Sequence, residues 1–185
     1  MLLPFTWVTD PHFDFLRPSE FDRFVKTLNE LSDKYIVLTG DISVGSRLAK
    51  DLGSLADGVA QTGKTVLFVL GNHDCYQETL EGARRIACSV ASVYKNLIYL
   101  PSLSEGVFTL KEGKDYLIGV NGYADARAGN FMQSTVSLAD YKLCHSLRGL
   151  TKERLMRVLQ DLGQESAMDF ADALSRIPKT AQRVF

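Results

Sequence analysis

The chain has 185 residues, with 21 Lys and Arg against 22 Asp and Glu, so its formal net charge is −1 at pH 7. Its 45% apolar and 23% charged residues are typical of a globular domain, and the length predicts one domain over residues 1–185. No basic run is present, which argues against nucleic acid as a bound partner and leaves it only as a substrate. No apolar stretch approaches a membrane span, so no membrane partner is expected.

The cysteine content indicates the cellular compartment. Cys75, Cys88 and Cys144 are odd in number and widely spaced, which disfavours a disulfide framework or a zinc-cysteine site. The apolar start MLLPFTWVTD lacks a basic flank and a small-residue cleavage site, so it is interpreted as a core strand and not as a signal peptide. These features predict a cytoplasmic protein.

The first half of the chain alternates strand-like and helix-like segments. Buried strands are predicted at 3–9, 35–39 and 65–70. A helix is predicted after each strand: the first is capped by Ser19, the second ends at Gly63, and the third covers roughly 78–93. Such alternation predicts an α/β fold with a parallel sheet and right-handed crossovers.

The pattern changes in the second half. Short strands are predicted at 97–100, 106–110 and 116–120, with a turn at 112–115 that indicates a hairpin and the start of a second sheet. Residues 121–149 are predicted to be an insertion or long loop with one short helix. Two helices follow, with apolar faces at 155–162 and 167–174, and TAQRVF at the end of the chain indicates a strand that begins there.

Three polar clusters each follow a predicted strand, namely TDPHFD (9–14), TGDIS (39–43) and LGNHD (70–74). The carboxyl ends of parallel strands share one crevice, so the clusters should converge. The residues expected there are Asp10, His12, Asp41, Asn72 and His73. Carboxylate, imidazole and amide oxygen suit a pair of divalent ions, and one Asp can bridge both ions.

The motifs D-x-H, G-D and G-N-H-D in this order resemble those of the calcineurin-like metallophosphoesterase superfamily, over residues 5–76. The resemblance implies a β-sandwich flanked by helices, in αββα layers. It also implies two divalent metal ions, whose identity among Mn, Fe, Zn and Mg stays open. The implied metal ligands are Asp10 and His12 for the first ion, Asp41 as the bridge and Asn72 for the second ion.

The resemblance further implies a hydrolase that cleaves a phosphomonoester or phosphodiester by attack of a metal-bridging hydroxide. The substrate would be a small-molecule or phosphoprotein phosphate ester. His73 would act as general acid for the leaving oxygen or as a positive stabiliser of the phosphoryl group. Asp74 would orient His73 by pairing with its imidazole.

Two further parts of the family pattern are missing, a His in a T-H-x-P-P-like turn and a G-H-x-H motif. His145 is the remaining histidine, and it is interpreted as a helix or loop residue. We therefore expect a chain cut within the fold, with a weak second metal site and exposed sheet edges that allow self-association. The alternatives are a catalytically incomplete scaffold or interaction domain of the same fold, and a site that a second chain completes.

Other candidates near the motifs have less specific interpretations. Asp14 is interpreted as a helix-proximal or solvated residue, and Cys75 as a small buried residue. Within the 121–149 segment, Tyr123, Arg127 and Asn130 are candidates for contact with the phosphate or its leaving group, because Arg is well suited to phosphate.

Overall fold

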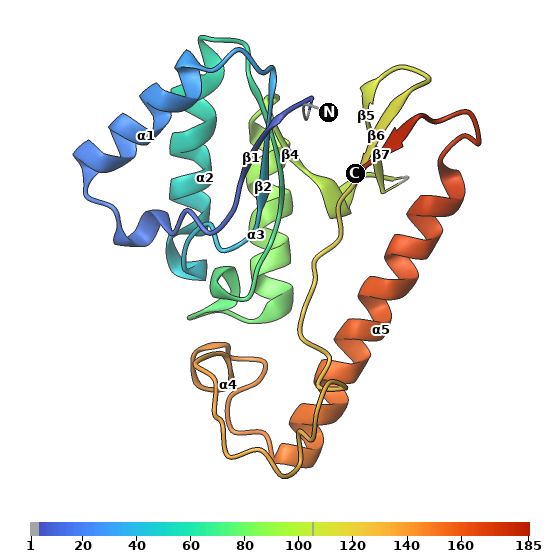
Figure 1. Ribbon diagram of the computed structural model, residues 1–185. Coiled ribbons are helices and arrows are strands. Elements are labelled where there is room, and N and C mark those ends of the chain that lie inside the picture. The colour runs from blue at the N-terminus through green and yellow to red at the C-terminus, as the bar shows by residue number, and fades with distance from the viewer. Residues whose placement is uncertain (1–3, 105) are drawn as a thin grey trace.

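The computed structural model describes residues 4–104 and 106–185 (Figure 1). Its first sheet is parallel and has the strand order β1-β2-β3-β4. The strands are β1 (Thr6–Val8), β2 (Tyr35–Thr39), β3 (Thr65–Val69) and β4 (Leu97–Tyr99). The predicted strands at 35–39 and 65–70 are confirmed. The strand predicted at 97–100 belongs to this first sheet, as β4, and not to the second.

Three crossover helices connect these strands and cover one face of the sheet (Figure 1). They are α1 (Pro18–Glu30), α2 (Gly45–Ala60) and α3 (Leu80–Val93). The prediction that Ser19 caps α1 was wrong, because Arg17 holds that position. The carboxylate of Glu20 accepts a hydrogen bond from the Arg17 backbone N–H at 2.9 Å, so the capping box begins two residues earlier.

Side chains of the central strands alternate between two apolar cores. Ile36 and Leu38 of β2 pack on the helix side, in a core that also contains Leu52 and Phe68. Val37 points to the opposite face, where it joins the smaller core between the two sheets. Because both faces of β2 and β3 are covered, these strands consist of continuous apolar runs.

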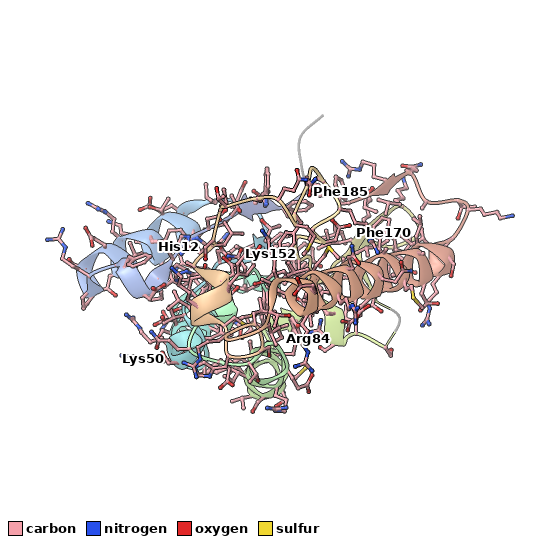
Figure 2. The ribbon with its side chains drawn as sticks, turned by 90° about the horizontal axis from the view of Figure 1, so that it is seen from below. His12, Lys50, Arg84, Lys152, Phe170 and Phe185 are labelled. Carbon is pink, nitrogen blue, oxygen red and sulfur yellow. The ribbon has the colours of Figure 1, made fainter. Side chains whose placement is uncertain are left out.

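The second sheet has the order β5-β6-β7, and it confirms the predicted hairpin. Strands β5 (Val107–Lys111) and β6 (Asp115–Ile118) pair antiparallel, and β7 (Arg183–Val184) pairs parallel with β6. The two facing sheets and the flanking helices confirm the predicted α/β sandwich. A cavity of about 620 Å³ lies between the sheets, and Phe170 and Phe185 are among its lining residues (Figure 2).

One continuous helix, α5 (Lys152–Arg176), replaces the two helices predicted from the sequence. Leu155, Leu159 and Ala173 are its buried residues, and Leu155 and Ala173 lie 18 residues apart, which is about five helical turns, so both ends of the helix have a residue on the same buried side. Arg84 of α3 pairs with Glu165 of α5 at 2.7 Å and links the two layers (Figure 2). Among the described residues, no helix combines the length and apolar composition that a bilayer crossing requires.

Candidate metal centre

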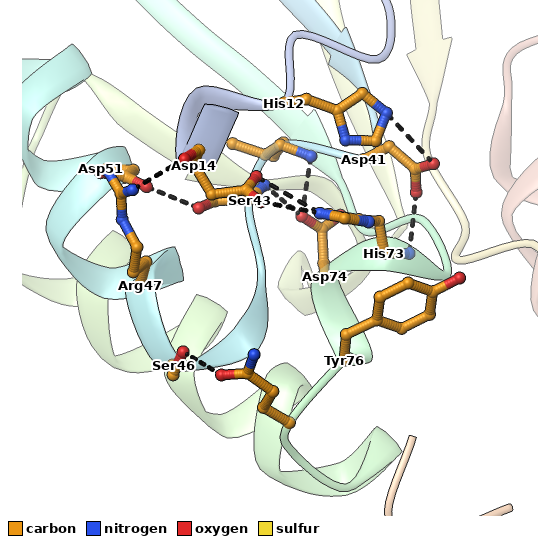
Figure 3. Close-up of polar contacts among 12 residues, drawn as sticks. His12, Asp14, Asp41, Ser43, Ser46, Arg47, Asp51, His73, Asp74 and Tyr76 are labelled. Atoms are coloured by element: carbon orange, nitrogen blue, oxygen red, sulfur yellow. Dashed lines mark hydrogen bonds and ion pairs between the residues drawn. The ribbon is translucent and has the colours of Figure 1, made fainter. Parts of the chain in front are cut away.

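The three polar clusters converge at the carboxyl ends of β1, β2 and β3 (Figure 3). Ligand atoms of Asp10, His12 and Asp41 all lie within 4.8 Å of one another, and so do those of His12, Asp14 and His73. His12 belongs to both groups, which makes it the centre of the cluster. The convergence that strand order predicted is therefore present for Asp10, His12, Asp41 and His73, and Asp14 is an addition.

The backbone at this cluster is held in a conformation that side chains disfavour. Asp10, His12 and Asp41 have φ angles of 50°, 42° and 51°, in the left-handed region. Each such residue costs on the order of 1 kcal/mol or more, and such conformations persist where surrounding contacts fix them, often at functional sites. The left-handed turns direct two carboxylates and one imidazole towards one point.

Two glycines allow the β2 and β3 loops to touch. A Cβ atom on Gly40 would lie 2.5 Å from the backbone nitrogen of Gly71, and one on Gly71 would lie 2.1 Å from Oδ1 of Asp41. Any side chain at either position would push the loops apart. The glycines of the G-D and G-N-H-D motifs are thus required by this close approach.

The Asp74 carboxylate holds the same two loops together through hydrogen bonds to their backbone. Its side chain is 0% exposed, and its Oδ1 accepts hydrogen bonds from the backbone N–H groups of Ile42 at 2.8 Å and Ser43 at 2.9 Å. Its Oδ2 accepts from the N–H of Gly71 at 2.8 Å. Burial raises the pKa of Asp74 to about 7, although the three amides oppose that shift. The expected pairing of Asp74 with the His73 imidazole is not what the structure shows, because both carboxylate oxygens are used by the loops.

Asp14 pairs with the His73 ring instead. Its carboxylate lies 3.1 Å and 3.3 Å from Nε2 of His73, and its side chain is only 8% exposed, so the interpretation as a solvated residue was wrong. Asp14 lies in a short 3-10 helix, Phe13–Phe15. Arg47 of α2 donates to the Asp14 backbone carbonyl at 3.0 Å and also pairs with Asp51 at 3.2 Å, which anchors this turn to α2.

The donor set fits a divalent metal ion. Nδ1 of His12 is a buried atom with no hydrogen-bond partner in the part of the chain that the structure describes, which is costly for a polar group unless a ligand satisfies it. Nε2 of the same ring lies 4.0 Å from Oδ2 of Asp41. Oδ1 of Asp41 already accepts from the backbone N–H of His73 at 3.0 Å, which fixes the carboxylate. Carboxylate and imidazole together suit Mn, Fe and Zn.

Comparison with known proteins identifies the family of the chain. A family model described as calcineurin-like phosphoesterase matches residues 3–165. The chain belongs to the calcineurin-like phosphoesterase family. This family membership is consistent with the three motifs and with the sandwich fold.

Solved structures show more distant likeness to this calcineurin-like chain. A crystal structure of TT1561 from Thermus thermophilus is 18% identical with a TM-score of 0.47, and covers 64% of this chain and 48% of its own. A second crystal structure is 15% identical with a TM-score of 0.45, with 64% and 52% covered. The chain thus spans about half the length of these structures. A search of curated proteins gave no match.

The three candidates in the 121–149 segment of this calcineurin-like domain make local contacts, and their contact with a phosphate stays a prediction. The guanidinium of Arg127 pairs with Asp125 at 3.0 Å, and Asn130 accepts from the backbone of Gln133 at 3.1 Å, so both serve local turns. Tyr123 donates its hydroxyl to Asp140 at 2.9 Å. Exposed His145 is outside the ligand groups found among the described residues.

An open pocket of about 480 Å³ borders the ring of His73 in this calcineurin-like site. Asp14, Phe15, Arg47 and Tyr76 are among its lining residues. The His73 and Tyr76 ring centroids are 4.8 Å apart, so the imidazole lies against an aromatic wall. Cys75, as predicted, is buried, and burial raises the pKa of its thiol, which argues against a reactive role.

Proposed function

We propose that this chain is a phosphoester hydrolase that uses two divalent metal ions, with His73 as the group that handles the proton of the leaving oxygen. The observation that carries the proposal is the buried His73–Asp14 pair beside the His12–Asp41 cluster. When bound, divalent ions would neutralise charge on the phosphoryl oxygens and lower the pKa of a water. Asp10, His12, Asp41 and Asn72 are the proposed ligands.

The chain's own residues supply the acid. Nε2 of His73 is held by Asp14, and Nδ1 has no hydrogen-bond partner among the described residues. Nδ1 is therefore the ring atom left to give a proton to the leaving oxygen. The Asp14 carboxylate places a negative charge beside the ring and fixes the tilt of the ring, as the group that orients a catalytic acid or base does. General acid catalysis of this kind contributes about 10²–10⁴-fold in rate.

The test is metal-dependent hydrolysis of bis(p-nitrophenyl) phosphate and of p-nitrophenyl phosphate, after removal of bound metal and addition of Mn²⁺. We expect Mn²⁺ to restore activity in the wild type. His73→Ala should lower kcat by about 10²-fold or more, and Asp41→Asn should abolish the response to Mn²⁺. His145→Ala, which removes an exposed histidine from the 121–149 segment, is the matched control.

The two substrates separate the monoesterase and diesterase possibilities. Unchanged hydrolysis in both His73→Ala and Asp41→Asn would overturn the proposal. No hydrolysis together with no Mn²⁺ uptake in the wild type would favour the alternative of a scaffold or interaction domain.

A further inference from the structure

The 121–149 segment is tied to the residues that directly follow the G-N-H-D motif. The backbone N–H of Gln77 donates to the carbonyl of Leu143 at 2.9 Å, and that of His145 donates to the carbonyl of Glu78 at 2.8 Å. Tyr76 and Cys144 form an isolated antiparallel bridge. The segment therefore packs beside the candidate metal centre as a fixed part of the fold, and its short helix α4 (Asp140–Leu143) starts there.

Asp140, the first residue of α4, contacts two tyrosines. Its side chain is 8% exposed, and its Oδ2 accepts from the hydroxyl of Tyr76 at 3.1 Å while its Oδ1 accepts from the hydroxyl of Tyr123 at 2.9 Å. The Tyr76 oxygen in turn accepts from Nδ2 of Asn72 at 3.3 Å. A chain of hydrogen bonds thus runs from Asp140 in the 121–149 segment, through Tyr76, to the proposed metal ligand Asn72.

The direction of these bonds is fixed at the Asp140 end. A carboxylate can only accept, so the single hydroxyl proton of Tyr76 is committed to Asp140. The Tyr76 oxygen can then only accept from its other neighbour, and Asn72 must face it with the NH₂ group. The carbonyl oxygen of the Asn72 amide is consequently turned away from Tyr76. Divalent ions bind the amide oxygen and not the NH₂ group.

We propose that Asp140 and Tyr76 are positioning residues that set the orientation of the Asn72 amide, so that its oxygen is presented to the second divalent ion. The inference rests on the proposed function in taking Asn72 as a ligand of a second divalent ion. Groups that fix a metal ligand from outside typically contribute about 10–100-fold to metal affinity. The 121–149 segment therefore contributes to metal binding although none of its residues is a proposed ligand.

Two control variants distinguish the proposed positioning role from a purely structural role of these hydrogen bonds. Tyr123 shares the same carboxylate as Tyr76, but among the described residues the Asn72 side chain hydrogen-bonds to Tyr76 and not to Tyr123. Tyr123→Phe is thus a matched control that removes one phenol oxygen from Asp140 and leaves the Asn72 bond in place. Asn72→Asp is a second control, because a carboxylate offers oxygen whichever way it is turned.

The first measurement needs no metal. In an NMR spectrum of the metal-free protein, the Asn72 side-chain NH₂ should show slowed exchange with water. Tyr76→Phe should remove that protection and Tyr123→Phe should keep it. Protection that is absent in the wild type, or kept in Tyr76→Phe, would overturn the orientation argument.

The second measurement is a titration with Mn²⁺, with free Mn²⁺ followed by EPR. We expect two ions to bind, and Tyr76→Phe to weaken the second by about 10–100-fold. In the Asn72→Asp background the same change should alter affinity by no more than about twofold, as for uncoupled sites. Equal losses in both backgrounds, equal losses in Tyr123→Phe, or no second ion in the wild type would each overturn the proposal. Thermal melts check that every variant is folded.

The two proposals fail in different ways. Metal binding that depends on Tyr76, without any hydrolysis, would remove the phosphoesterase proposal and keep this one. Hydrolysis that depends on His73, with Mn²⁺ affinity indifferent to Tyr76, would do the reverse.

Discussion

Replacement of Asp74 by Ala should destabilise the fold and not only the site. Asp74 is the acceptor for three backbone N–H groups, those of Ile42, Ser43 and Gly71, at 2.8–2.9 Å. The alanine variant leaves all three donors without their partner in the interior. Because these donors belong to the loops after β2 and β3, the variant also frees the left-handed turn at Asp41.

The size of the effect follows from the number of orphaned groups. A buried N–H without a partner costs about 1–3 kcal/mol, and the half-buried Gly71 amide can regain water, so we expect a loss of about 3–5 kcal/mol in the free energy of unfolding for Asp74→Ala. Asp74→Asn keeps one oxygen for Ile42 and Ser43 and turns a donor towards Gly71, so it should lose about 1–3 kcal/mol. The alanine variant should be the worse of the two.

The assay is urea unfolding followed by circular dichroism, in EDTA so that metal binding does not contribute. Asp161→Ala, a change at an exposed position of α5, is the control and should stay within about 0.5 kcal/mol of the wild type. If the free energy of unfolding of Asp74→Ala is within about 1 kcal/mol of the wild-type value, with an unchanged m-value, the three hydrogen bonds to Asp74 do not hold the loops after β2 and β3. If Asp74→Asn is the less stable variant, the assignment of its acceptors is wrong.

Two further predictions concern ion pairs. Asp14→Asn should lower kcat by about 10-fold or more with little change in Mn²⁺ affinity, because the imidazolium of His73 loses its counter-charge. Steady-state kinetics and a Mn²⁺ titration check this prediction. A loss of Mn²⁺ affinity without a loss of kcat would contradict it. The Arg183 guanidinium lowers the pKa of the Asp115 carboxyl below its usual 3.8, so their pairing stabilises the fold above that pH and is lost as pH falls through the lowered pKa. Arg183→Gln should therefore lower Tm at pH 7 by more than at pH 3, and an equal loss at both values would contradict the pairing.

The sequence was sufficient for the features that local pattern determines. Apolar runs such as YIVLT place β2 at residues 35–39, because a strand buried on both faces must be apolar throughout. The convergence of Asp10, His12 and Asp41 followed from strand order alone, since parallel strands end at one edge. The prediction that these residues and Asn72 bind metal stays a prediction.

The features that the sequence did not predict depend on contacts between distant segments. The two helices expected after residue 150 lie on either side of Gly163. A Cβ atom there would lie 2.5 Å from Cβ of Asp125, so this glycine lets the 121–149 segment pack closely against one continuous helix. The Asp74 carboxylate was expected to pair with His73 because Asp74 is the next residue, but two of its three partners lie about thirty positions earlier, in the loop after β2. The signal for Asp14 was available, because it follows His12 by two residues in the same motif.

The single long helix α5 has a mechanical consequence. Its 25 residues measure about 37 Å at 1.5 Å per residue, and they run from the 121–149 segment to the second sheet (Figure 1). Near its middle, Ser166 donates to the carbonyl of Asn121 at 2.6 Å, and the Asn121 side chain accepts from the backbone of Leu70 at 3.0 Å. Leu70 is two residues before Asn72. The middle of α5 is therefore hydrogen-bonded through Asn121 to the residue that follows β3. A tilt of α5 at the second sheet would shift the position of Asn72.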